Sequence, residues 1–222
     1  MYPAMAKYFR AQGAQVATMW TYYLYDNSEG GLPRTHSHNL NMVTTPRKAA
    51  GFLVAGQVFK ESPRYEPYKT AEEDSDSFDN TALSFPLDLS AYADEELLIH
   101  SGDLPAGFVN LPRIPKMITG YGSSPFVRYT GKGMYFLEAV FENHKASNHW
   151  TLKVMPHAVF DGEGHAVVNR EKAFPFTLLI SGMDRRRWEV YRIKNGKKMR
   201  VQTKPPSITF NATPGDYEII KK

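Results

Sequence analysis

The segment Trp150-Thr151-Leu152-Lys153-Val154 decides the fold class, because its apolar and polar residues alternate without a break. That period of two places one set of side chains on the buried face of a strand and the other set on the face toward water. Alternation also runs through Leu83 to Leu89 and through Phe174 to Ile180. These segments predict a mainly β chain.

Several further short segments carry the same strand character, with turn residues between them. Asn195-Gly196 is a favoured two-residue hairpin turn, and Pro214-Gly215 is a second break. The additional strands are expected at 96–100, 115–120, 126–129, 134–141, 187–193, 197–202, 207–210 and 216–220. Many short strands with regular turn signals predict an antiparallel β-sandwich over residues 81–222.

Residues 1–61 have a different pattern. A helix is expected from Pro3 to the stop at Gly13, and a second over 46–60, with Thr45 as its cap and Pro46 at its first position. The run Ala14 to Tyr25 between them is β-prone and lacks alternation, as in strands buried on both faces. A linker is expected at 62–80, which contains Pro63, Pro67 and an acidic run.

This αβα segment is short for an α/β domain. Its one expected strand has no partner, and helix 46–60 is apolar around most of its circumference. We therefore expect residues 1–61 to be the last part of a larger α/β domain. Three arrangements are open for these residues: packing on the sandwich, joining a partner chain, or remaining poorly ordered.

Composition excludes several classes of protein. The 222 residues are 42% hydrophobic and 13% aromatic, which is too apolar for a disordered chain. The absence of cysteine excludes disulfides and thiolate metal sites. We find no transmembrane run and no signal peptide. The 27 basic residues face 23 acidic ones, and the basic clusters are interpreted as solvated hairpin tips. Neither nucleic acid nor a membrane is expected as a partner.

Three N-terminal stretches carry a resemblance to a known family: Tyr2-Pro-Ala-Met-Ala-Lys-Tyr-Phe-Arg-Ala-Gln-Gly13, Ala17-Thr-Met-Trp-Thr-Tyr22 and Thr45-Pro-Arg-Lys-Ala-Ala-Gly-Phe-Leu53. In this order they resemble the seventh helix, eighth strand and eighth helix of a bacterial glycoside hydrolase with a (β/α)8, or TIM, barrel and a C-terminal β-sandwich. Within the sandwich, 118–125, 131–137 and 150–156 resemble the tails of polysaccharide-degrading enzymes.

The resemblance implies the C-terminal portion of a glycoside hydrolase that acts on a poly- or oligosaccharide. Such enzymes use two carboxylates, usually at the ends of barrel strands four and seven. Those strands would precede residue 1, so no catalytic residue is assigned and the chain itself is expected to be non-catalytic. Its expected partners are carbohydrate and either the missing barrel portion or another chain. The full-length family is expected outside the cytoplasm.

The resemblance also implies candidate substrate-binding residues. Trp20 would lie at the end of the eighth strand as an aromatic platform for a sugar, followed by Tyr22 and Tyr23; the alternative for Trp20 is a core position. His36, His38 and Asn39 would lie in the following loop, where substrate contacts are made; the alternative there is a solvated loop. His36 and His38 could share a metal, but no third ligand is evident, so neither metal nor cofactor is assigned.

Two other functions remain open. A stand-alone carbohydrate-binding β-sandwich would expose a row of aromatic side chains on one sheet face. The candidates for that row are Tyr121, Tyr129, Tyr135 and Trp150, although the strand pattern around Trp150 also suits a core position. A structural β-sandwich of a larger assembly would instead dock residues 1–60 on another chain.

Overall fold

The computed structural model describes residues 2–18, 40–68, 75–142, 145–160, 166–183, 187–204 and 206–222. Two helices come first, and all later elements within these ranges are strands. The elements are α1 (Tyr2–Ala11), α2 (Pro46–Glu61), β1 (Ser75–Phe78), β2 (Thr81–Ser84), β3 (Leu89–Ala93), β4 (Leu97–His100), β5 (Met117–Gly120), β6 (Val127–Tyr129), β7 (Tyr135–Glu142), β8 (Lys145–Val154), β9 (His157–Phe160), β10 (Ala166–Asn169), β11 (Phe174–Leu178), β12 (Trp188–Lys194), β13 (Lys197–Val201), β14 (Ile208–Ala212) and β15 (Gly215–Lys221).

The strands form one large sheet and two small ones. The large sheet has ten strands in the order β1-β2-β3-β4-β5-β7-β8-β15-β12-β13. A three-stranded sheet has the order β14-β11-β6, and β9 pairs with β10 as a hairpin. The predicted mainly β class is confirmed. The expected purely antiparallel pairing is wrong at one place, because β4 and β5 run parallel and make the large sheet mixed. Within the described residues, no barrel is closed.

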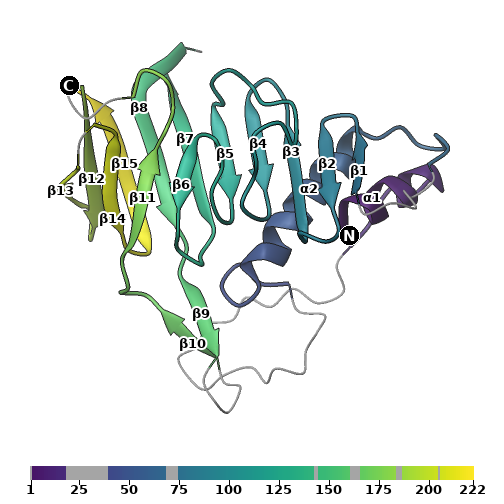
Figure 1. Ribbon diagram of the computed structural model, residues 1–222, viewed down its shortest axis with the longest axis horizontal. Coiled ribbons are helices and arrows are strands. Elements are labelled where there is room, and N and C mark those ends of the chain that lie inside the picture. The colour runs from purple at the N-terminus through teal and green to yellow at the C-terminus, as the bar shows by residue number, and fades with distance from the viewer. Residues whose placement is uncertain are drawn as a thin grey trace.

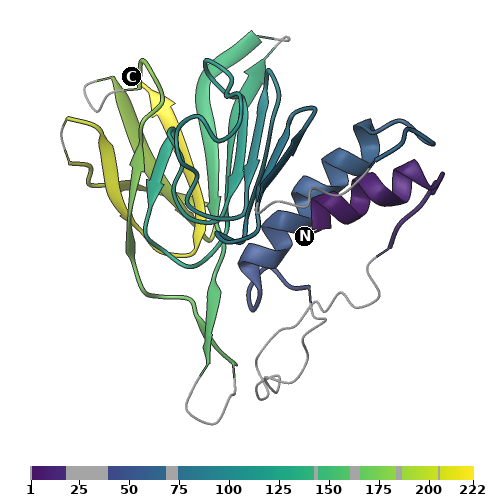
Figure 2. The same cartoon turned by 45° about the vertical axis from the view of Figure 1, so that its right-hand side comes forward.

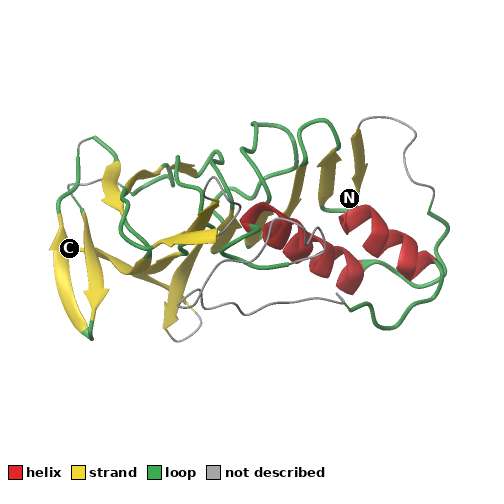
Figure 3. Ribbon diagram, turned by 90° about the horizontal axis from the view of Figure 1, so that it is seen from below, coloured by secondary structure: helices red, strands yellow, loops and turns green. Residues whose placement is uncertain are grey.

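The large sheet lies between two different layers (Figures 1 and 2). The β14-β11-β6 sheet packs on one face, which we call the core face. Helices α1 and α2 pack on the other, which we call the helix face. Figure 3 shows the two helices side by side beneath the first strands of the large sheet.

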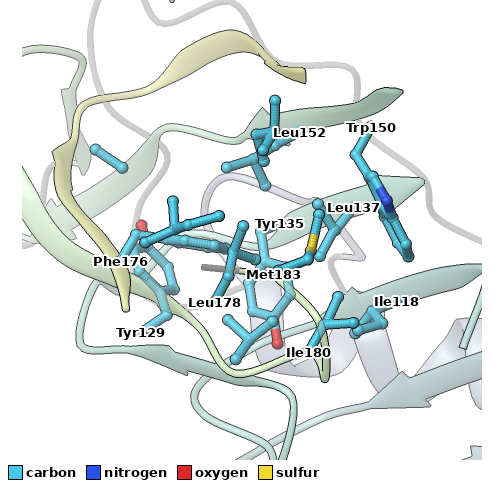
Figure 4. Close-up of a cluster of buried hydrophobic side chains, with 14 of the residues drawn as sticks. Ile118, Tyr129, Tyr135, Leu137, Trp150, Leu152, Phe176, Leu178, Ile180 and Met183 are labelled. Carbon is cyan, nitrogen blue, oxygen red and sulfur yellow. The ribbon is translucent and has the colours of Figure 1, made fainter. Parts of the chain in front are cut away.

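The main core lies between the large sheet and the β14-β11-β6 sheet (Figure 4). Trp150, Leu152 and Val154 of β8 are all buried in it, as their alternation predicts. Tyr135 of β7 meets Phe176 of β11 edge to face, with ring centroids 5.4 Å apart. This arrangement is favourable for aromatic pairs and joins the two sheets at their centre.

Helix α2 covers the helix face over the first strands of the large sheet. Val54 packs between Tyr92 of β3 and Ile99 of β4, and Ala55 and Val58 pack against α1. The broad apolar surface of α2 is therefore covered by α1 and by the sheet, the first of the three arrangements considered above. The expected strand within Ala14–Tyr25 is not formed over residues 14–18, and its remainder lies outside the described residues.

Local structure corrects three other expectations. Leu83 and Leu89 do not share one strand, because residues 85–88 turn between β2 and β3 and expose Phe85 and Leu87. The linker expected at 62–80 contains β1. The side chain of Thr45 makes no capping hydrogen bond to α2; instead, its hydroxyl accepts a hydrogen bond from the Asn41 N–H and donates one to the Asn41 carbonyl oxygen.

A close approach at Gly120 gives a test of this packing. A Cβ atom there would lie 2.2 Å from Nε2 of buried His100, whereas a Cβ at exposed Gly56 in α2 would meet nothing within 4 Å. We expect Gly120→Ala to lower the free energy of unfolding by about 1–3 kcal/mol through overpacking. Gly56→Ala should raise it by about 0.5–1 kcal/mol, because alanine is the better helix former. Urea denaturation of the two variants measures both effects, and equal stabilities would contradict the described packing.

Candidate functional site

The helix face has an open groove beyond the helices. Its volume is about 530 Å3, and it crosses β7, β8, β15 and β12 beside the loop that enters α2. Its lining includes the apolar residues Met42, Phe136, Met155 and Ile193, the polar residues Glu138, Thr151, Lys153, Asp216 and Glu218, and parts of Leu152 and Tyr217. The combination of a few apolar side chains with convergent polar groups is typical of a small-molecule or sugar site.

Strand register builds this groove. Phe136, Lys153, Asp216 and Ile193 are successive cross-strand partners, one from each of the four strands. A second row, two residues along each strand, contains Glu138, Thr151 and Glu218. Because alternate residues of a strand point to opposite faces, these rows face the groove while their neighbours Leu152 and Tyr217 enter the core.

Two carboxylates of the groove lie beside basic side chains. Glu218 Oε2 lies 2.6 Å from Lys198 Nζ and 3.4 Å from His149 Nε2. Asp216 Oδ1 lies 3.9 Å from Lys153 Nζ, a looser and more exposed pair. The groove thus presents both hydrogen-bond acceptors and charged donors, as recognition of a polyhydroxylated ligand requires.

A second hollow of about 500 Å3 adjoins this face at the end of β13. Pairing between β12 and β13 ends at Val190 and Val201, and the chain beyond β13 then leaves the sheet. The residues around the hollow are Trp188, Glu189, Val190, Arg200, Val201, Gln202, Thr203, Lys204 and Lys222. We call it the edge pocket.

Glu189 is the carboxylate of the edge pocket. Its Oε2 accepts a hydrogen bond of 2.6 Å from the Tyr191 hydroxyl, and its Oε1 lies 2.6 Å from Arg200 Nη2. Lys222 Nζ is 3.6 Å from the same Oε1. The Tyr191 hydrogen bond, followed by the charges of Arg200 and Lys222, holds the pKa of Glu189 below its usual value.

His100 and Tyr135 form a separate polar pair inside the core. His100 Nδ1 donates to the carbonyl oxygen of Gly102 at 2.7 Å, so Nε2 accepts from the Tyr135 hydroxyl at 2.8 Å. Desolvation by complete burial lowers the pKa of His100 to about 4 and raises that of Tyr135. Perturbed groups can mark an active site. Since both side chains are sealed from solvent, we assign this pair a structural role.

The sequence-predicted site residues do not contribute to this picture. Trp20, Tyr22, Tyr23, His36, His38 and Asn39 all lie outside the described residues. The expected exposed aromatic row is wrong, because Tyr129, Tyr135 and Trp150 are buried in the main core and Tyr121 is half-buried. Of these four residues, Trp150 and Tyr129 have polar neighbours on both sides in the sequence, a pattern that is also typical of a core position.

Sequence reasoning missed the groove residues. In β8 and β15, the polar positions of the alternating pattern are Thr151, Lys153, Asp216 and Glu218. These polar positions were the sequence feature from which the groove could have been predicted. It could not be used without knowing that β8 and β15 are neighbours.

Metal and membrane candidates were also considered. Within the described residues, no group of three or more His, Cys, Asp or Glu could hold a metal ion. The helices of the same residue ranges include none long and apolar enough to cross a membrane.

No protein-family model, curated protein or solved structure matches this chain.

Burial of His100 predicts an acid-sensitive fold. Because its pKa is lower in the folded chain than the ordinary 6.5, the unfolded chain binds more protons between about pH 4 and 6.5. The contribution of neutral His100 to the free energy of unfolding is therefore fully present above pH 6.5. It is lost on acidification, which lowers the free energy of unfolding by up to roughly 3 kcal/mol. We expect the free energy of unfolding of His100→Gln, measured by urea denaturation, to decline less steeply than that of the unmodified chain as the pH falls through that range.

An NMR titration of the His100 ring in the unmodified protein measures the same property directly. A His100 pKa near the ordinary value would contradict the structural assignment.

Proposed function

We propose that this chain is the C-terminal portion of a glycoside hydrolase-like protein that acts on poly- or oligosaccharide. Its β-rich part would bind carbohydrate in the groove of the helix face. The groove across β7, β8, β15 and β12 is the observation that carries this proposal. The notion of an αβα barrel remnant followed by a β-sandwich accessory domain belongs to the same proposal and rests on the sequence resemblance.

The chemistry of the groove suits a sugar. Phe136 and Met155 offer apolar surface to the C–H groups of a pyranose ring, and Phe136 is only half-buried. Glu138, Thr151 and Lys153 are exposed beside them and can exchange hydrogen bonds with hydroxyl groups. A carbohydrate is therefore a better match for this mixed lining than a wholly apolar ligand.

Binding without catalysis is the expected behaviour of the chain. The resemblance assigns the two catalytic carboxylates to barrel strands four and seven, and none of the matching stretches corresponds to either strand. In the groove, Asp216 and Glu218 lie beside Lys153 and Lys198. Each of these carboxylates is thus held in an ion pair with a lysine, and the proposal gives both a role in contacting the ligand. A stand-alone carbohydrate-binding module would use the same groove.

A binding assay with matched variants tests the groove. Soluble neutral polysaccharides (xyloglucan, galactomannan, arabinan and hydroxyethylcellulose) serve as probes in affinity electrophoresis and calorimetry. We expect at least one to bind the unmodified chain, and Glu138→Gln with Lys153→Gln to weaken that binding about tenfold by removing charged hydrogen-bond partners. Lys132→Gln, an exposed lysine outside the groove, is the control. Retention of full affinity by the double variant would rule out this groove.

A turnover assay tests the non-catalytic assignment. Incubation of the chain with the same polysaccharides should release no new reducing ends. Release that persists after repeated purification would show that the chain carries its own catalytic groups.

A further inference from the structure

Positive charge is concentrated at the C-terminal end of the chain. Residues 187–222 contain nine Lys or Arg against three Asp or Glu, whereas residues 1–186 contain 18 against 20. The overall charge of +4 therefore hides a basic segment joined to a slightly acidic one. Such an asymmetry favours binding to an anion.

The fold gathers part of this charge around the edge pocket. Arg200, Lys204 and Lys222 all line it, although Lys204 and Lys222 are separated by the whole of β14 and β15. Arg200 and Lys222 are well exposed, at 66% and 46% of their side-chain surface. Only Glu189 among the lining residues is acidic, so the pocket has a net positive charge.

Ion pairs made by strand β13 relate the edge pocket to the groove. Lys198 and Arg200 occupy alternate positions of β13 and therefore face the same side of the sheet. Lys198 contacts Glu218 of the groove, and Arg200 contacts Glu189 of the pocket. A polymer lying in the groove can thus reach the pocket by passing over these two cations.

We propose that the edge pocket binds the anionic group of an acidic sugar unit, so that the ligand class is a polysaccharide bearing carboxylate or sulfate. Arg200, Lys204 and Lys222 would donate charge-assisted hydrogen bonds to its oxygens. This inference rests on the proposed carbohydrate-binding function and narrows its ligand class.

Nucleic acid fits this surface less well. Proteins that bind single strands stack bases on exposed aromatic rings. Among the described residues, the large exposed aromatic side chains are Tyr8, Phe9, Tyr65, Phe85 and Phe141, none of which lies in β12, β13 or β15. Tyr191 of β12 is half-buried and donates its hydroxyl to Glu189.

Matched polymer pairs provide the test. Dextran sulfate is compared with dextran, and polygalacturonate with its methyl ester, by calorimetry at low and moderate salt. We expect one charged member to bind at least about tenfold more tightly than its neutral partner, with an affinity that falls as salt rises. The two pairs distinguish a sulfate from a carboxylate ligand.

Two double variants locate the site. Lys204→Gln with Lys222→Gln removes two cations of the edge pocket, and we expect it to weaken binding of the charged polymer about tenfold or more. Lys194→Gln with Lys197→Gln removes two cations from the exposed tip of the β12–β13 hairpin and serves as the charge-matched control. The control should retain nearly full affinity.

Three results would overturn the inference. These are equal binding of charged and neutral polymers, equal losses in both double variants, and equally tight binding of a 30-mer DNA of the same charge. Binding of neutral polysaccharides without a preference for charge would leave the proposed function standing and reject only the anionic ligand. Failure of every polysaccharide would reject both.

Discussion

The architecture depends on burial of the large sheet from both sides at one end only. All five residues of β3 are buried, because α2 covers one face and the main core the other. The hydroxyl groups of Ser90 and Ser101, 3.0 Å apart, satisfy each other under the helix. Within the described residues, the helices do not extend over β8, β15 and β12, and the same face forms the groove there. Coverage of the sheet thus sets the position of the candidate site.

Clear alternation made some strands predictable from the sequence. Strands buried on one face, such as β8 and β15, alternate between core residues and exposed ones and were located from sequence. β3 has no apolar alternation to detect, since both of its faces are buried. The regular spacing of Phe85 and Leu87 was misleading, because these residues lie in a turn with Asp88 at a φ of 47°. Local alternation therefore does not distinguish a strand with one buried face from a turn that exposes its apolar residues.

The candidate site was less predictable, because it depends on pairing between distant segments. Thr151 and Glu218 face each other only because β15 lies beside β8, and no local pattern specifies that neighbour. Aromatic residues were the first candidates for sugar contacts, yet Tyr135 and Trp150 are buried and stabilise the core through their large apolar area. The edge pocket was not predicted for a similar reason. Arg200, Lys204 and Lys222 are only three residues, and they come together only in the folded chain.

The hairpin that turns at Asn195 and Gly196 has a consequence for association between copies of the chain. Both turn residues have positive φ, at 51° and 72°, which sends β13 back along β12 as the outermost strand of the large sheet. An outermost strand offers unpaired backbone groups to any other strand. Here it carries Lys197, Lys198 and Arg200, so two copies that approach through this strand repel each other. The arrangement opposes edge-to-edge aggregation and keeps this end of the sheet in solution.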